Sequence, residues 1–415
     1  MSQMVRPLSE SLVRRLSVTG LWLLIINGMI GAAIFGAPAE AARLAGAFSP
    51  WLFLVCGVLI APIILCFARL SSHFSGTGGP VLYATEAFGP FAGFQVGWCL
   101  YIARLTAFAA NSNLLVTTLG DFSVAARTAI LFAICAALTL LNLLGTRGAI
   151  RWLGVITTLK FAPLLMLVAA GLIRLDLAPT LAPPHFDRDF GAAILLVLYA
   201  YVGFENGLVA AGEAKNPQRD IPRALIAALL ICALLYGILQ LICLEAGGGS
   251  LVQVSGKLLG PVGASVMTAG VIASVGGHLS GVMFAVPRIT YRLGLDGQLP
   301  KWFAFVHPSR KTPAASILFL GAAGFLLAAS GSFVWLAGLS VLTRVPVWIC
   351  SILALYRLKR RLDVVALSIC LALLTQVSAL AYVNGAALVA AGSLLYWAAR
   401  RSAKPHSDQP PPAAA

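Results

Sequence analysis

The residues best suited to binding a small molecule are glycines that interrupt apolar stretches. Gly28, Gly31 and Gly36, followed by Pro38, lie inside the apolar stretch Leu16–Arg43. Glycine inside a helix costs about 1 kcal/mol relative to alanine, so a helix that only crosses a bilayer gains nothing from it. A helix that unwinds at membrane depth offers backbone N–H groups and a half-helix dipole to an anion. We therefore interpret this stretch as half of a binding site; the alternative is a small-residue face for close helix packing.

A second interruption is predicted in the sixth apolar stretch, where Gly203 and Gly207 flank Glu205. Two interrupted helices, each at the start of a five-helix block, are typical of inverted-repeat transporters that bind their substrate at the membrane midplane. Glu205 has two interpretations. It holds the unwound backbone N–H groups, or it takes up a proton or contacts a substrate ammonium group.

Three basic residues lie singly within apolar stretches, namely Arg104, Lys160 and Arg344. Charged groups at membrane depth are costly and usually functional. Because Glu205 is the only evident counter-charge, one hypothesis is a positive cavity that favours a substrate with an extra acidic or strongly polar group. In the alternative, one arginine pairs with Glu205 and the other extends to the membrane surface.

The composition identifies a polytopic membrane protein. The 415 residues are 60% hydrophobic and 10% charged, whereas soluble domains carry about 25% charged residues. The mean hydropathy is +0.92. The net charge of +15 comes from basic residues in short connections between apolar spans, so we expect no nucleic-acid partner. The eight cysteines lack CxxC spacing, and no catalytic, phosphate-binding or metal-ligand motif appears; we expect neither an enzyme nor a cofactor or metal.

About 20 apolar residues make one crossing, and the chain divides into twelve predicted spans. These spans are 17–38, 46–68, 92–117, 127–145, 153–173, 190–212, 223–245, 262–286, 313–329, 333–356, 363–380 and 384–399. The last two share a predicted turn at Asn384–Gly385. Most of the 29 lysines and arginines fall on one side if the N-terminus is cytoplasmic, and the positive-inside rule then places both termini in the cytoplasm.

The spans define the predicted domain organisation. A cytoplasmic N-terminus (1–16) precedes a first five-helix repeat (17–173) and a second one (190–356). Two additional C-terminal helices (363–399) and a disordered cytoplasmic tail (402–415) follow. The expected class is thus an all-α membrane protein with interruptions in its first and sixth helices.

Several motifs in this order resemble the amino acid–polyamine–organocation superfamily of transporters. They are Gly28-Met-Ile-Gly-Ala-Ala-Ile-Phe35, Gly78-Gly-Pro-Val-Leu-Tyr83, Gly203-Phe-Glu205 with Gly212-Glu-Ala-Lys-Asn-Pro217, and Arg288-Ile-Thr-Tyr291 with Asp296-Gly-Gln-Leu-Pro300. The resemblance implies a leucine-transporter-type fold, with five-plus-five inverted repeats, and transport of amino acids or related amines.

The resemblance also implies where a zwitterionic substrate binds. The first interruption, with Gly28 and Met29, would present its amides to the substrate carboxylate. These amides belong to Gly31, Ala32 and Ala33. The ammonium would be bound by carbonyl groups of the sixth helix, around Tyr199, Ala200 and Val202. Ala33 departs from the glycine usual in the family, and alanine disfavours the positive-φ conformations that glycine adopts freely.

Lys160 lies near the middle of the fifth span, just before Pro163. In related proteins a lysine in this context resembles a substitute for a sodium ion that ties the fifth helix to the first interruption. Lysines removed from water can exchange a proton near neutral pH. Two hypotheses remain open: Lys160 replaces the cation and carries a coupling proton, or it is a permanently charged structural tether.

We therefore expect a secondary active amino acid transporter, driven by protons or by exchange and independent of sodium, that works by alternating access. The alternatives are a polyamine or organic-amine carrier and an amino acid exporter of the same fold. The expected partners are the small-molecule substrate and the lipid bilayer, and a homodimer is left open. The expected location is the cytoplasmic (inner or plasma) membrane.

Overall fold

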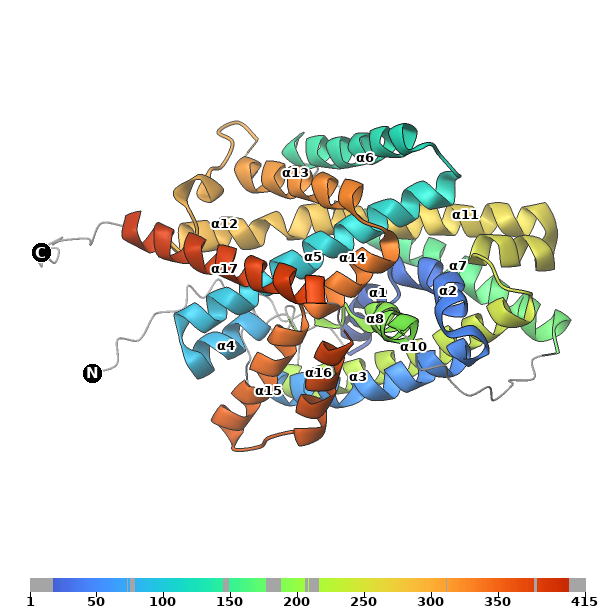
Figure 1. Ribbon diagram of the computed structural model, residues 1–415, viewed down its shortest axis with the longest axis horizontal. Helices are drawn as coiled ribbons and strands as arrows, with labels where there is room; N and C mark the ends of the chain where they lie inside the picture. Colours follow the sequence, from blue (N-terminus) through green and yellow to red (C-terminus); the bar gives the residue numbers. More distant parts are fainter. Residues whose placement is uncertain are drawn as a thin grey trace, which may run out of the picture.

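The computed structural model describes residues 18–72, 74, 79–144, 149–176, 188–205, 208, 216–310, 312–376 and 379–402. All regular elements in these residues are helical (Figure 1), which confirms the expected all-helical class. A chain in lipid has to satisfy its backbone hydrogen bonds internally, and a helix does so within one segment. Among the described residues, six helical stretches are long and apolar enough to cross a membrane: 33–71, 90–119, 124–144, 218–245, 251–295 and 333–359.

The described residues of the first half form seven α-helices and a short 3-10 helix. They are α1 (Val18–Met29), α2 (Ala33–Ala45), η1 (Gly46–Phe48), α3 (Ser49–Ser71), α4 (Pro80–Phe88), α5 (Pro90–Leu119), α6 (Val124–Leu144) and α7 (Ala149–Arg174).

The described elements of the second half are also α-helices, with one short 3-10 helix. They are α8 (Arg188–Tyr201), α10 (Pro217–Glu245), α11 (Leu251–Ala285), α12 (Pro287–Leu295), η3 (Lys301–Ala304), α13 (Ala314–Ser330), α14 (Phe333–Leu342), α15 (Val345–Lys359), α16 (Val364–Thr375) and α17 (Ala379–Ser402).

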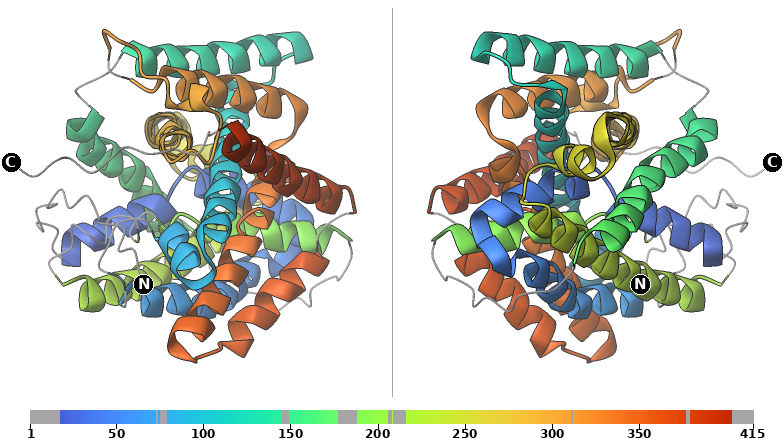
Figure 2. Two further views of the ribbon diagram at one scale, coloured as in Figure 1. Left: turned by 90° about the vertical axis from the view of Figure 1, so that its left-hand side faces the viewer. Right: turned by 90° about the vertical axis from the view of Figure 1, so that its right-hand side faces the viewer.

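The helices surround a central group formed by α1, α2 and α8 (Figure 1). Helix α1 packs on α10, and α2 packs on α8. Figure 2 shows α6 and α13 side by side along one edge of the molecule, while α15 and α16 form a hairpin at the opposite edge. The run 195–201 of α8 is apolar apart from two tyrosine hydroxyl groups, which suits its interior location, and all of its residues are buried.

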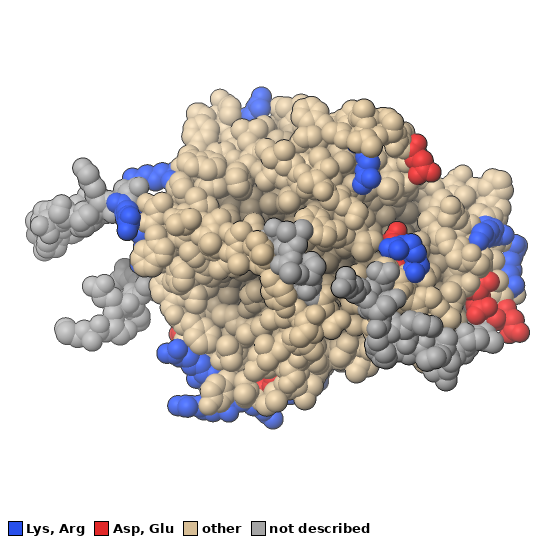
Figure 3. Space-filling model, in the orientation of Figure 1, with Lys and Arg blue, Asp and Glu red and all other residues tan. Residues whose placement is uncertain are grey.

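The surface agrees with a chain that lies in lipid. The face drawn in Figure 3 consists mostly of uncharged residues, and most of its charged side chains lie toward the left and right ends or the lower edge. Large apolar side chains such as Val58, Ile173 and Leu394 are exposed on the described helices. In water such a surface would be costly, whereas lipid tails are as apolar as these side chains.

Two local predictions from the sequence are wrong. Pro38 does not end the first span, because α2 continues through it to Ala45. Proline is tolerated inside membrane helices, where neighbouring helices satisfy the freed backbone groups. The turn predicted at Asn384–Gly385 lies inside α17, and the connection to α16 precedes Ala379. Asn-Gly favours a turn locally, but a membrane helix needs about 20 residues and accommodates the glycine at a small cost.

Candidate functional site

The first predicted binding stretch is interrupted as a helix. Helix α1 ends at Met29 and α2 begins at Ala33, with three non-helical residues between them. The N-cap residue Ala32 supplies no side-chain hydrogen bond to the first turn of α2. The first N–H groups of a helix have no acceptor within the helix. The start of α2 can therefore receive a negatively charged group.

Two details modify the predicted carboxylate site. The N–H group of Gly31 donates to the carbonyl oxygen of Met29 at 2.8 Å, so this amide is engaged in the present conformation. Ala33 does not have a positive φ. The alanine at this position is therefore compatible with the local backbone, and the departure from the family's glycine introduces no strain.

Lys160 of α7 holds the carbonyl end of α1. Its buried ammonium group donates to the carbonyl oxygens of Asn27 at 2.8 Å and Ile30 at 2.6 Å. The last carbonyl groups of a helix lack intrahelical donors and carry the negative end of the helix dipole. A lysine ammonium has three donors and a positive charge, so it satisfies both requirements at once.

Tyr236 of α10 joins the two predicted binding stretches. Its hydroxyl group lies 2.9 Å from the carbonyl oxygen of Met29 and 3.1 Å from that of Ala200. The tyrosine is fully buried. One side chain thus contacts the end of α1 and the end of α8, and it occupies one side of the Ala200 carbonyl that was predicted to bind the ammonium.

The polar run in α11 faces the same interruption. The hydroxyl group of Ser274 lies 3.5 Å from the carbonyl oxygen of Gly31. A β-carbon on Gly31 would lie 3.6 Å from Nδ1 of His278. The side of α11 that carries Ser274 and His278 therefore borders the non-helical residues between α1 and α2.

The second predicted stretch also ceases to be helical. Helix α8 ends at Tyr201, and Gly203 has a φ of +106° in the turn that follows. A β-carbon on Gly203 would lie 2.4 Å from the carbonyl oxygen of Gly28. Only glycine fits both the dihedral angle and the space. The turn after α8 is therefore in direct backbone contact with the last turn of α1, while Gly207 lies outside the described residues.

Glu205 contacts the turn after α8 and an arginine located between α14 and α15. Its carboxylate accepts a hydrogen bond from the N–H group of Gly203 at 2.8 Å and lies 3.4 Å from Nε of Arg344. Both side chains are almost fully buried. Arg344 lies between α14 and α15, and its Nη1 also donates to the carbonyl oxygen of Ser340 at 2.7 Å. The contacts of Glu205 are those of a residue that holds the unwound backbone.

Arg104 lies on the side of α5 that faces α8. Residues 104, 107 and 111 share one face of this helix, and the hydroxyl group of Tyr199 contacts that face at Oδ1 of Asn111 (3.0 Å) and at the carbonyl oxygen of Ala107 (3.4 Å). The carbonyl oxygen of Ala103, the residue before Arg104, accepts hydrogen bonds from the hydroxyl group of Ser340 at 2.7 Å and from Nη1 of Arg344 at 3.5 Å. Arg104 therefore belongs to the same polar cluster.

The remaining predicted residues of α8 are enclosed. Tyr199, Ala200 and Val202 are buried, and the hydroxyl group of Tyr201 donates to the carbonyl oxygen of Phe53 at 2.7 Å. The two tyrosines thus point to different helices, α5 and α3. Within the described residues the structure brings Lys160 and the residues of both interruptions together, with Arg104 and Glu205 beside them.

Sequence reasoning missed Tyr236 and Ser340. Tyr236 lies in an apolar helix, where a lone tyrosine gives no signal of its own. Its position one turn before Gln240 was the available clue, because two polar groups on one face of an apolar helix need partners. For Ser340, the available signal was its spacing of four residues from Arg344, because this spacing brings two side chains together on a helix.

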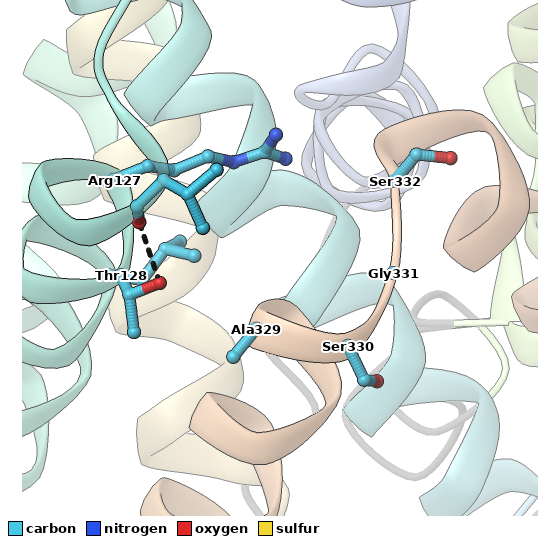
Figure 4. Close-up of a pocket in the computed structure, with 8 residues that line it drawn as sticks. Arg127, Thr128, Ala329, Ser330, Gly331 and Ser332 are labelled. Carbon is cyan, nitrogen blue, oxygen red and sulfur yellow. Dashed lines mark hydrogen bonds between the residues drawn. The ribbon is translucent and has the colours of Figure 1, made fainter.

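A pocket of about 230 Å³ lies elsewhere, between the first turn of α6 and the connection from α13 to α14 (Figure 4). Arg127 and Thr128 line it on one side and Ala329 to Ser332 on the other. Arg127 also donates a hydrogen bond to the side chain of Asn113. The pocket contains none of the predicted site residues, so it is separate from the cluster around the interruptions.

The chain is similar in sequence to several membrane transport proteins. The chain is 29% identical over 326 residues to the serine/threonine exchanger SteT of Bacillus subtilis, covering 71% of this chain and 72% of that protein. It is 29% identical over 353 residues to the methylthioribose transporter of the same bacterium, covering 77% and 76%. It is 26% identical over 370 residues to the branched-chain amino acid permease BcaP, also from B. subtilis, covering 81% and 78%.

The family model described as amino acid permease matches residues 16–390. This stretch contains both interruptions and every residue of the cluster described above. The match confirms the resemblance to the amino acid–polyamine–organocation superfamily. It also confirms that the chain belongs to a family of transporters and not of enzymes. The chain is a multi-pass membrane protein that belongs to the amino acid permease family.

Proposed function

We propose that this protein is a secondary active transporter that carries an amino acid across the cytoplasmic membrane by alternating access. The observation that carries the proposal is the direct contact between Gly28, in the last turn of α1 just before one non-helical segment, and Gly203, in the other. In this proposal each segment interrupts a membrane helix near the midplane. A zwitterion requires backbone groups of both interrupted helices around one point, and this contact supports such an arrangement.

The substrate carboxylate binds at the start of α2, to the N–H groups of Ala32 and Ala33. The missing side-chain cap of this helix supports that assignment. The N–H group of Gly31 joins them when it releases the carbonyl oxygen of Met29. The ammonium binds to carbonyl groups at the end of α8, around Tyr199 and Val202, on the side not occupied by Tyr236.

Lys160 takes the place of a bound cation. Its two hydrogen bonds to the end of α1 support this role, because a sodium ion would be held by the same kind of carbonyl oxygens. Transport is therefore independent of sodium and is driven by a proton gradient or by exchange. The relative named as a serine/threonine exchanger supports the exchange mode.

In the proposed transport cycle, two parts of the protein move relative to each other. The proposed architecture has twelve membrane spans, with five-helix repeats at 17–173 and 190–356 and two further helices at 363–399. Both termini lie in the cytoplasm. One bundle rocks about the site while Lys160 and Tyr236 keep α1 tied to α7 and α10.

A counterflow assay with purified protein tests the proposal. Proteoliposomes are loaded with single unlabelled amino acids, and entry of the same radiolabelled amino acid is measured in sodium and in choline buffers. We expect accumulation for at least one amino acid, at equal rates in both buffers. Putrescine and spermidine serve as alternative substrates. Counterflow of these amines alone would replace the proposal with an amine carrier, and strict sodium dependence would exclude the role of Lys160.

A further inference from the structure

The polar cluster contains more positive than negative charge. Among the described residues of the cluster, Arg104, Lys160 and Arg344 are basic and Glu205 is the single acidic residue. Lys160 and Arg344 are almost fully buried. Buried charges are normally compensated, because removal from water is costly for each of them. An anion that enters this cluster therefore gains from the excess positive charge.

Glu205 already has its contacts within the protein. It accepts the N–H group of Gly203 and pairs with Nε of Arg344. The other side of Arg344 is fixed by Ser340, through its carbonyl oxygen and its hydroxyl group. Arg344 and Glu205 thus form a structural unit between α14 and the turn after α8.

Arg104 differs from Arg344 in its accessibility. It is partly exposed, although it lies in the middle of α5, where the residues on both sides of it are buried. Three residues near the interruptions are also partly exposed, namely Asn27, Gly28 and Gly203. A small molecule that reaches the interruptions therefore has a partly exposed arginine in the same polar cluster.

His278 lies beside the first interruption, on helix α11, which packs on the helix α5 that carries Arg104. A β-carbon on Gly31 would lie 3.6 Å from its Nδ1, and the charges of Lys160, Arg104 and Arg344 all act on its ring. The imidazole therefore lies next to the segment just before α2, where the substrate carboxylate is proposed to bind. A substrate bound at α2 can extend its side chain past His278 toward Arg104.

We propose that Arg104 is a specificity-determining residue that binds a second anionic group on the substrate, so that the preferred substrates are the acidic amino acids aspartate and glutamate. This inference rests on the proposed function. The carboxylate of the substrate side chain forms a bidentate pair with the planar guanidinium group, which matches it in geometry. The same charge repels lysine, arginine and polyamines.

Competition in proteoliposomes separates this inference from the proposed function. Counterflow of a labelled amino acid is measured against unlabelled glutamate, glutamine, aspartate, asparagine and lysine. Glutamine and asparagine are neutral isosteres of the acidic substrates. We expect glutamate or aspartate to compete at least about tenfold better than its amide. Counterflow of neutral amino acids with no preference for the acids would overturn the inference and leave the proposed function intact, whereas absence of all counterflow would overturn both.

Substitution of Arg104 gives a second, independent readout. Arg104→Gln should lose the preference for glutamate over glutamine, while uptake of the neutral isostere persists; Arg104→Lys should retain part of the preference. Arg43→Gln is the matched control, since Arg43 is an exposed arginine paired with Glu40. If Arg104→Gln retains the same preference as the native protein, Arg104 does not bind the anionic group.

Discussion

Gly203 and Gly28 are in backbone contact so close that no side chain fits between them. A β-carbon at position 203 would come within 2.4 Å of the Gly28 carbonyl oxygen and 2.8 Å of its carbonyl carbon. These residues lie 175 positions apart in the numbering of the chain. Their contact joins the two segments that the sequence marks as unsuited to a continuous helix.

Gly203→Ala should abolish transport and lower the thermal stability of the purified protein. The left-handed φ of +106° alone costs an alanine about 1–3 kcal/mol, and the clash with backbone atoms adds to this. Thermal unfolding in detergent and counterflow measure the two effects. Gly281→Ala is the control, because a β-carbon there meets nothing within 4 Å and the residue lies in regular helix. Equal behaviour of the two variants would contradict the close contact.

Tyr236→Phe should impair transport because it removes the hydroxyl group that bridges Met29 and Ala200. The loss leaves two buried carbonyl groups with one donor fewer, at about 1–3 kcal/mol. Tyr101→Phe is a matched control, since the hydroxyl group of Tyr101 is buried without a hydrogen-bond partner in the described part of the chain. We expect the control to be as stable as the native protein or slightly more stable. Thermal unfolding of both variants checks the comparison.

The positions of the interruptions could be predicted from the sequence because glycine acts locally. Gly31 and Gly203 lie in non-helical backbone, whereas Gly28 lies in the last turn of α1 and Gly36 lies inside α2. The contact of Lys160 with the first interruption followed from its isolation in an apolar span and from the family resemblance. In each case one unusual residue in a uniform apolar background carried the information.

The partners across the site could not be predicted in this way. The pairing of Glu205 with Arg344 depends on how α14 and α8 are oriented, which a local pattern does not encode. The bridging role of Tyr236 depends on two chain segments 171 residues apart, at Met29 and Ala200, meeting at its hydroxyl group. The break between α14 and α15 at Arg344 was also not expected, although Pro346 follows it.

Lys160→Met should abolish transport, and no sodium concentration should restore it. The substitution keeps much of the side-chain volume but removes the donors to Asn27 and Ile30, each a charged hydrogen bond of about 1.5–3 kcal/mol. Lys257→Met is the control: Lys257 also binds carbonyl oxygens at a helix end, those of Ala246 and Gly248, but it is exposed. Transport by Lys160→Met that depends on sodium would instead show that the site still accepts a cation.

From the charges in the polar cluster, we predict a specific order of thermal stabilities for variants of Glu205 and Arg344. Glu205→Gln keeps an acceptor for the N–H group of Gly203 but leaves Arg344 and Arg104 without their shared counter-charge, and loss of one partner of a buried pair costs about 3–5 kcal/mol. Arg344→Gln should cost less, because the charge of Arg104 still acts on Glu205.

The double variant Glu205→Gln/Arg344→Gln completes the cycle. It removes one charge of each sign, so the total in the cluster is the same as in the native protein, and it should be more stable than Glu205→Gln alone. Thermal unfolding of the four proteins gives the coupling between the two residues. Purely additive losses would mean that the 3.4 Å pair contributes nothing, and Glu205 would then act only through the backbone of Gly203.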